Sequence, residues 1–260
     1  MAFLECKFFS DVLGLSTAFN VIYPEKVEKQ IGLVSNNSIG DVPVLYLLHG
    51  ASDDHTVWAR RTSIERYVAN KNLCVVMPNA DLSYYTDMKN GRNYFKYICE
   101  ELPETIKQTF NISNRKSDTF IAGLSMGGYG AFKAALTYPD KYCAAASLSG
   151  VVDIVDQINK WDEDRIKILE NIFGDMNKIQ GSKNDLYTLL DRVPNVKSLK
   201  LFQCCGLDDF LYEGNIKFKG IVEKLKLDFH FEDGPGNHEW GYWDTMIQKV
   251  IDWLPISKDI

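Results

Sequence analysis

No segment of this chain is continuously apolar over the roughly eighteen residues that a membrane-spanning helix needs. The first residues also lack a basic stretch followed by an apolar one, so we see no signal peptide and expect a cytoplasmic protein. Blocks of basic residues are absent too, and the net charge is −6. We therefore expect neither nucleic acid nor a membrane as a partner, and favour a small uncharged substrate.

Metal, redox and nucleotide signatures are missing as well. The six cysteines contain no CxxC pair, and Cys74, Cys143, Cys204 and Cys205 lie in apolar runs, where cysteine behaves as a small hydrophobe. The sequence has no HExxH and no GxGxxG, and Tyr129 stands where a phosphate-binding loop needs lysine. We expect no metal and no cofactor.

Apolar runs alternate with helical patterns along most of the chain. Strands are expected at 2–10, 17–23, 42–48, 73–77, 118–124, 142–148, 199–205 and 227–232, and helices at 63–70, 93–110, 126–138, 216–225 and 240–254. This alternation predicts one α/β domain over residues 1–260, with a mainly parallel central sheet and helices on both faces. Residues 24–41 are expected to form a loop. Residues 151–197 show no clear strand and predict a helical insertion, either a cap over the site or a solvated excursion.

A candidate nucleophile lies in the segment FIAGLSMGGYGA at 120–131, where Gly123, Ser125 and Gly127 form a GxSxG. In a nucleophile elbow the serine sits on a strained turn between strand and helix, and its neighbours are small because a Cβ there would collide with backbone. The five residues alone are weak evidence, since they occur by chance in about one such chain in fifteen. The apolar run before them and the helical pattern after them make Ser125 the predicted nucleophile.

Acidic and basic partners for this serine follow later strands. Asp208 and Asp209 come after the predicted strand at 199–205, and His238 comes after the one at 227–232. The carboxyl ends of parallel strands gather functional residues at one edge of a sheet. The order Ser, Asp, His is that of an α/β-hydrolase, which is the fold we predict.

Histidine is scarce enough for the general base to be found by elimination. Of the four histidines, His230 lies inside a predicted strand, His55 in a polar loop and His49 in a turn, which leaves His238. For the acid we favour Asp209, which would hold the imidazole in the tautomer that accepts a proton. Asp208 stays as the alternative, and either carboxylate is also able to cap the next segment.

The tetrahedral intermediate of acyl transfer needs two backbone donors. The amide of Met126 directly follows the nucleophile, and the HGA turn after the strand at 42–48 offers the amide of Ala51. We predict these two groups as the oxyanion hole.

Several longer segments support this interpretation. They are YLLHGASDDHTVW, SYYTDMKNGRNYFKYICEELP, AGLSMGGYGAFKAAL, CCGLDDFLYEGN and GPGNHEWGYWD, together with the opening MAFLECKFFSDVLGLSTAFNVIYPE. Together they resemble the tributyrin esterase (EstA-like) branch of the esterase D and S-formylglutathione hydrolase group, over nearly the whole chain. The resemblance implies a carboxylesterase for short acyl esters with Ser125, Asp209 and His238 as its triad, no cofactor, and often an oligomer. The cysteine pair at 204–205 departs from the expected strand and puts nothing catalytic in doubt.

Aromatic residues near these motifs are candidate substrate contacts. Trp58, Tyr84, Tyr85, Trp240 and Tyr242 are predicted to wall an acyl or alcohol pocket, with ordinary packing as the alternative for each.

The predicted function is that of a serine carboxylesterase acting on acetyl to butyryl esters through an acyl-enzyme. The alternatives are a thioesterase such as S-formylglutathione hydrolase, an acetyl xylan or feruloyl esterase, and an acyltransferase of the same fold. A catalytically inactive hydrolase-fold binding protein is the alternative outside the enzymes.

Overall fold

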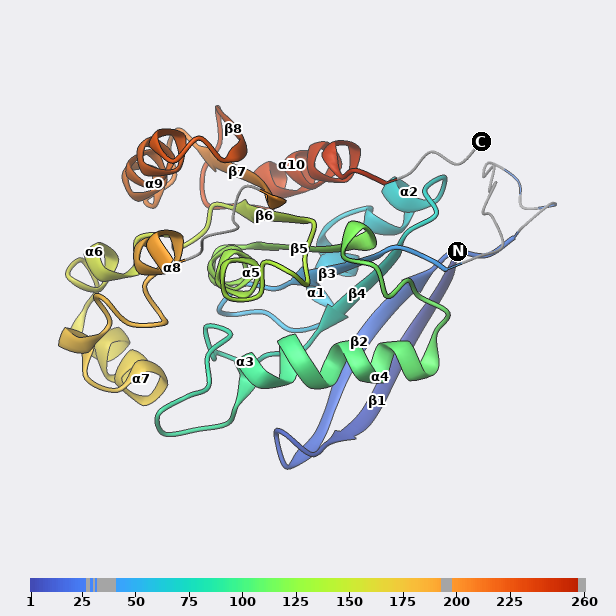
Figure 1. The fold of residues 1–260 in the computed structure, drawn as a ribbon, viewed down its shortest axis with the longest axis horizontal. Coiled ribbons are helices and arrows are strands. Elements are labelled where there is room, and N and C mark those ends of the chain that lie inside the picture. Colours follow the sequence, from blue (N-terminus) through green and yellow to red (C-terminus); the bar gives the residue numbers. More distant parts are fainter. Residues whose placement is uncertain (27–28, 30, 32–40, 193–197, 257–260) are drawn as a thin grey trace.

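The computed structural model describes residues 1–26, 29, 31, 41–192 and 198–256. Most of the loop predicted at 24–41 lies outside the described residues, as do the last five residues of the insertion predicted at 151–197. Eight strands form one sheet in the order β1-β2-β4-β3-β5-β6-β7-β8 (Figure 1). Among the described helices, none is long and apolar enough to cross a membrane.

The sheet is parallel from β4 to β8 and antiparallel at its first edge. Its strands are β1 (Ala2–Ser10), β2 (Leu15–Tyr23), β3 (Val44–Leu48), β4 (Cys74–Pro78), β5 (Thr119–Leu124), β6 (Ala144–Leu148), β7 (Lys200–Gly206) and β8 (Asp228–Gly234). β1 and β2 form a hairpin, and β2 joins β4 antiparallel. The predicted α/β-hydrolase fold with a mainly parallel sheet is therefore confirmed.

Helices cover both faces of this sheet. They are α1 (Val57–Arg61), α2 (Ile64–Val68), α3 (Tyr94–Lys96), α4 (Leu102–Thr109), α5 (Met126–Thr137), α6 (Ile154–Ile158), α7 (Glu163–Phe173), α8 (Leu186–Arg192), α9 (Tyr212–Lys224) and α10 (Trp240–Trp253). Shorter turns of other helix types are the π-helical η1 (Tyr97–Glu101) and the 3₁₀ turns η2 (Lys116–Asp118) and η3 (Met176–Lys178).

The central strand β3 shows how the two halves of the core divide. Val44, Tyr46 and Leu48 pack into the half of the core that also holds apolar residues of α3 to α9. Leu45 and Leu47 point to the opposite half, which α1, α2 and α10 complete. Successive side chains of a strand face opposite ways, so a strand apolar at every position is buried on both faces.

Two helices differ from their predicted extents. The predicted helix at 93–110 is one run of α3, η1 and α4, and the π turn lies directly before Pro103. Proline removes one helical hydrogen bond and crowds the preceding turn, so the wider π turn is the local adjustment that its position requires. α9 begins at Tyr212 rather than at Ile216, because its first turn follows immediately on the loop after β7.

Candidate active site

The turn between β5 and α5 carries Ser125 in a backbone conformation that side chains rarely adopt. Its φ is 53° and its ψ is −116°. The amide of Ser125 donates to Leu148 O at 2.9 Å, which ties the turn to the end of β6. A Cβ on Gly123 would come within 2.5 Å of the backbone of Gly127, and a Cβ on Gly127 within 2.5 Å of Leu48 O. The two glycines therefore let strand, turn and helix approach closely enough to hold the strained serine.

We expect Gly127→Ala to lower the free energy of unfolding by about 3 kcal/mol, because the new methyl group overlaps the carbonyl of Leu48 and neither backbone is free to move. Urea unfolding measures the change. Gly220→Ala is the matched control, since this α9 position has nothing within 4 Å of the added Cβ. There the gain in helix propensity should stabilise the protein by about 0.5–1 kcal/mol. Equal effects at both positions would contradict the proposed close approach.

Two hydrogen bonds join the three side chains that the sequence selected. His238 Nε2 lies 3.0 Å from Ser125 Oγ, and His238 Nδ1 lies 2.9 Å from Asp209 Oδ2. The other oxygen of Asp209 accepts the amide of Leu211 at 2.9 Å. Burial alone would raise the pKa of Asp209, but the hydrogen bonds from His238 and the Leu211 amide outweigh it and hold that pKa below its usual range. The neighbouring Asp208 is exposed, and among the described residues the carboxylate paired with His238 is that of Asp209.

Close packing of two loops brings the aspartate and the histidine together. Leu207 and Asp208, after β7, donate their amides to Gly234 O and Gly236 O, at the end of and after β8. A Cβ on Gly206 would collide with the backbone of Gly236. Since β7 and β8 are adjacent and parallel, their following loops lie side by side at one edge of the sheet.

Aromatic rings hold the imidazole of His238 from two sides. Phe210 lies 4.7 Å from it between ring centroids, and Trp243 lies 4.9 Å away in an edge-on arrangement. The sequence interpretation missed both. Phe210 directly follows Asp209, and Trp243 lies one helical turn after Trp240. Their closeness in sequence to predicted site residues is the signal that could have identified them.

The amides of Ala51 and Met126 are the two predicted donors of the oxyanion hole. Neither donates a hydrogen bond to another group within the described residues. Met126 is the first residue of α5, where a helix leaves its amides without internal partners. Ala51 and Ser125 line the same pocket.

The chain before Ala51 is held by three side chains. Trp58 Nε1 donates to Leu48 O at 3.0 Å, and the hydroxyl of Tyr85 donates to His49 O at 3.0 Å. The buried His49 ring accepts the amide of Ala80 at 3.0 Å through Nε2. His49 therefore helps to hold this loop, and the segment that carries the Ala51 amide is anchored on several sides.

A pocket of about 680 Å³ opens over Ser125. Its lining comes from β5, from the loops after β3, β4, β5, β7 and β8, from α10 and from the insertion: Gly50, Ala51, Ser52, Asp53, Leu82, Tyr84, Leu124, Ser125, Val151, Trp161, Arg165, Ile168, Leu169, Phe210, His238, Glu239, Trp240 and Trp243. The wall thus mixes apolar and charged groups. Within the described residues, no group of histidine, cysteine or acidic side chains is arranged to hold a metal ion.

The predicted aromatic contacts divide into two sets. Tyr84 and Trp240 line the pocket. Trp58 and Tyr85 do not, which corrects the prediction, because both rings are buried and their polar ends bind the carbonyls of β3 and its loop. Tyr242 also lies off the lining, packed against Gly236.

Part of the predicted insertion faces this pocket. Trp161 and the α7 residues Arg165, Ile168 and Leu169 line it, with the Arg165 guanidinium 4.9 Å from the centre of the Trp161 ring. No spacing in the sequence distinguished these positions from an ordinary amphipathic helix. Their role depends on where the insertion is anchored.

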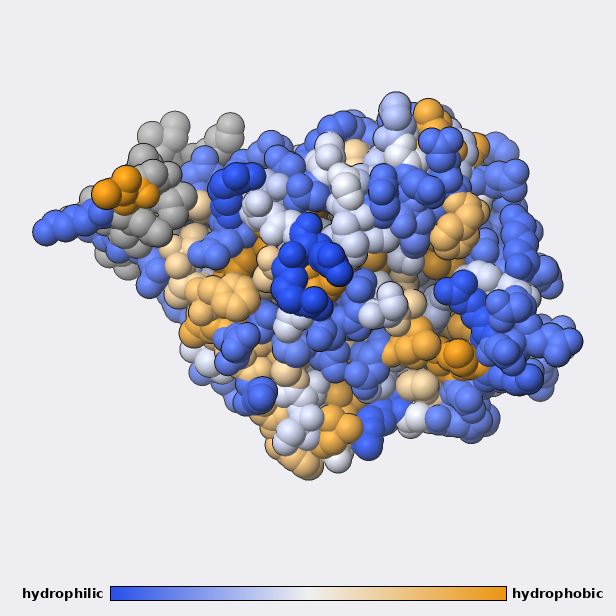
Figure 2. Space-filling view, turned by 180° about the vertical axis from the view of Figure 1, so that it is seen from behind, coloured by the Kyte–Doolittle hydropathy of each residue, from blue (hydrophilic) through white to orange (hydrophobic). Residues whose placement is uncertain are grey.

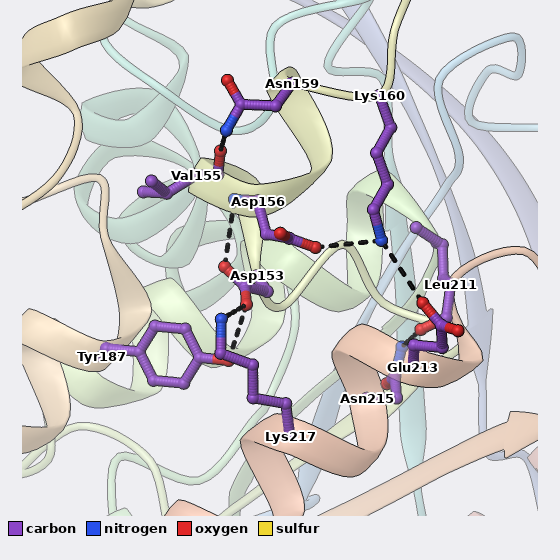
Figure 3. A network of polar contacts seen from close by, with 10 residues as sticks. All are labelled: Asp153, Val155, Asp156, Asn159, Lys160, Tyr187, Leu211, Glu213, Asn215 and Lys217. Carbon is purple, nitrogen blue, oxygen red and sulfur yellow. Dashed lines mark hydrogen bonds and ion pairs between the residues drawn. The ribbon is translucent and has the colours of Figure 1, made fainter.

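A polar network anchors the insertion to α9 (Figure 3). Asp153 Oδ2 accepts from Lys217 Nζ at 2.5 Å and from the Tyr187 hydroxyl at 3.1 Å, so one buried carboxylate joins α6, α8 and α9. Lys160 adds contacts to Asp156 at 3.0 Å and to Glu213 at 3.5 Å. Asp153 and Lys160 thereby fix the first part of the insertion to α9, and Tyr187 joins α8 to the same carboxylate.

A buried lysine on α5 connects three segments. Lys133 Nζ donates to Thr86 Oγ1 at 2.7 Å, to Asn184 Oδ1 at 2.8 Å and to Tyr85 O at 3.4 Å. Its side chain is 2% exposed, and burial lowers the pKa of Lys133 to about 7. This lysine ties the loop of Tyr84 and Tyr85 to α5 and to the insertion.

We expect this lysine to make stability rise with pH. Between about pH 7 and pH 10 the unfolded chain keeps a proton that the folded protein has lost, so raising the pH favours the folded state. The free energy of unfolding of the wild type, minus that of Lys133→Met, should increase by up to about 2 kcal/mol from pH 6 to pH 8.5. Chemical unfolding at both pH values measures it. The exposed Lys96→Met is the control and should show no such increase; a flat difference for Lys133→Met would refute the expectation.

Several known proteins are similar to this chain. Residues 22–253 match the family described as "Putative esterase". An acetyl esterase of Caldicellulosiruptor saccharolyticus is 28% identical over 100% of both chains. The fluorophosphonate-binding serine hydrolase FphF of Staphylococcus aureus is structurally similar, with a TM-score of 0.86 and 37% identity over 97% of this chain and 98% of that one. An S-formylglutathione hydrolase of Staphylococcus aureus has a TM-score of 0.81 and 37% identity over the same shares, 97% and 98%.

These similarities support the predicted esterase D and S-formylglutathione hydrolase group without selecting its tributyrin esterase branch. Because the family match spans most of the sequence, this chain belongs to the "Putative esterase" family.

Proposed function

We propose that this protein is a serine carboxylesterase of the tributyrin esterase branch, which hydrolyses acetyl to butyryl esters through an acyl-enzyme. The observation that carries the proposal is the continuous chain of hydrogen bonds from Ser125 through His238 to Asp209, in which Ser125 and His238 line an open pocket. A hydroxyl in this relation to a carboxylate-oriented imidazole is an activated nucleophile.

In the proposed reaction, Ser125 Oγ attacks the acyl carbon while its proton passes to His238 Nε2. The amides of Ala51 and Met126 donate to the oxyanion that forms, and each such donor is worth about 3 kcal/mol. The imidazolium then returns the proton to the alcohol oxygen as the ester C–O bond breaks. Water repeats the two steps on the acyl-enzyme, which releases the acid and restores the serine hydroxyl. Asp209 stabilises the imidazolium in both halves.

The mixed wall of the pocket supports a short acyl group. A long alkyl chain would have to lie against Asp53, Arg165 or Glu239 and displace water from their charges. We expect kcat/KM for p-nitrophenyl acetate and butyrate to agree within about tenfold, and the value for octanoate to be lower by at least about another tenfold. The three esters share one leaving group, so their rates report the acyl site alone. Rates that climb steadily from acetate to octanoate would contradict a short-acyl specificity.

A thioesterase acting on S-formylglutathione is the second candidate. The exposed guanidinium of Arg165 in the pocket wall favours it, because glutathione carries carboxylates that an arginine binds well. The structural relative that bears this name is a further reason to test it. Parallel kcat/KM values for S-formylglutathione and p-nitrophenyl acetate decide between thioester and ester as the preferred substrate.

Other substrates distinguish the remaining alternatives. Methyl ferulate and acetylated xylan fragments test for an esterase of plant polysaccharides, and added alcohol acceptors test for acyl transfer in place of hydrolysis. Failure of every substrate, with the fold intact by circular dichroism, would leave the catalytically inactive binding protein as the correct description.

A further inference from the structure

The first strand of the sheet is an open edge. Within the described residues β1 pairs with β2 alone, along its whole length from Ala2 to Ser10 (Figure 1). One row of backbone amides and carbonyls along a nine-residue strand therefore faces outward. Such a long edge invites a further strand, and proteins normally cover or disrupt it.

Side chains of β1 alternate between the core and the outer face. Leu4, Cys6 and Phe8 pack on the core that α4 covers. The odd-numbered residues face the other way, and two of them are exposed aromatics, with Phe3 41% and Phe9 61% exposed. Figure 2, which looks at the molecule from behind, shows apolar surface mixed with hydrophilic residues along its lower left side, where the β1–β2 hairpin lies.

The exposed side chains of β1 are complementary to those of a second, antiparallel copy of the strand. Read along the strand they are Phe3, Glu5, Lys7 and Phe9, an apolar, acidic, basic and apolar order. If a second copy of β1 runs antiparallel with Cys6 opposite Cys6, then Glu5 lies opposite Lys7 twice and Phe3 lies opposite Phe9 twice. Opposite charges and aromatic pairs at such positions stabilise a sheet.

Other registers lose this match. A shift of the second copy by two residues places Glu5 opposite Glu5 or Lys7 opposite Lys7, and like charges directly opposite are destabilising. A shift by one residue would put the exposed side chains of one copy beside the core-facing side chains of the other. The charge pattern therefore selects the register centred on Cys6.

A hollow next to this strand offers room for the second copy. A cavity of about 400 Å³ lies beside the start of β1, lined by Met1, Phe3 and Ile64 among others from α1 and α2. In the register centred on Cys6, Phe9 of the second copy lies directly across from Phe3, at the rim of this cavity. Burying that largely exposed ring there removes apolar surface from water on both sides of the two-fold axis.

We infer that two copies of this chain associate through β1, antiparallel and centred on Cys6, to form a dimer with one continuous sheet. Backbone hydrogen bonds between the two edges supply the attraction, and the facing charges and aromatics fix the register. This association is independent of the proposed esterase reaction.

Charge reversal at two positions tests the association. Analytical ultracentrifugation should give a dimer for the wild type, and a dissociation constant raised at least about tenfold for Glu5→Lys and for Lys7→Glu, because each places like charges opposite one another twice. The combined variant Glu5→Lys/Lys7→Glu restores opposite pairs and should recover the dimer. Lys224→Glu, which makes the same charge change on exposed α9, should leave the dimer intact.

Crosslinking of the wild-type protein gives a second test of the dimer, which does not require the charge-reversal variants to fold. A short bismaleimide should join two wild-type chains through Cys6, as identified by peptide mapping, and Cys6→Ser should abolish the link. A monomeric wild type, a dimer indifferent to charge at residues 5 and 7, or a dimer linked through another cysteine would each overturn the inference.

Discussion

Ser125→Ala is expected to lower kcat/KM for p-nitrophenyl acetate by at least about 10⁴-fold. The hydroxyl is the group that forms the proposed acyl-enzyme. It lies 3.0 Å from His238 Nε2, and among the described residues no other hydroxyl forms a hydrogen bond with that nitrogen. The variant should fold like the wild type, because the elbow needs small neighbours on either side and makes no demand for the hydroxyl itself. Initial rates measured with the same ester for both proteins give the ratio.

Covalent labelling provides the control for this loss. Diethyl p-nitrophenyl phosphate transfers a phosphoryl group to an activated serine, so wild-type protein should gain one adduct by mass spectrometry, located on Ser125. Ser63→Ala, which alters a serine outside the pocket lining, should keep both the rate and the adduct. Labelling or turnover that persists in Ser125→Ala would show that another residue is the nucleophile.

The second large effect is expected at the acid. Asp209→Asn should reduce kcat by about 10³- to 10⁴-fold, because an amide is able to donate to His238 Nδ1 and would then stabilise the wrong tautomer. It also loses the negative charge that balances the imidazolium. The expected loss is in kcat rather than in KM, since Asp209 is buried behind the histidine and does not line the pocket.

Asp208→Asn is the matched comparison, one residue away with the same change of charge. Its side chain is exposed and makes no contact with the imidazole, so kcat should stay within about threefold of the wild type. Equal losses at both positions, or a larger loss at Asp208, would show that the hydrogen bond between Asp209 and His238 is not the one used in turnover.

Much of the fold was predictable because its signals are local. The strands buried on both faces, such as β3 and β5, are short continuous apolar runs that end at glycine or serine. The elbow was predictable for the same reason, since Gly123, Ser125 and Gly127 lie within five residues and meet one another in space. The π turn before Pro103 was not predicted, although its cause is local too: a single proline whose effect reaches only one turn back.

The pocket wall was less predictable because it is assembled from distant segments. Trp58 and Tyr85 look like pocket aromatics in the sequence. In the structure both rings are buried, and each donates a hydrogen bond to a carbonyl at the end of β3 or just after it. Arg165 and Ile168 lie on a helix whose pattern is ordinary. They reach the pocket because contacts with distant segments hold the insertion in place, among them those of Asp153 and Lys133.

The sequence by itself determined which kinds of groups are present and in what order along the strands: a serine on a tight turn, then aspartates, then a histidine. Tertiary structure alone decided which aspartate meets the imidazole and which side chains wall the pocket. The physical reason is that backbone strain and side-chain alternation act over a few residues. The choice between Asp208 and Asp209 depends on how the loops after β7 and β8 pack, through contacts such as that of Gly206 with Gly236.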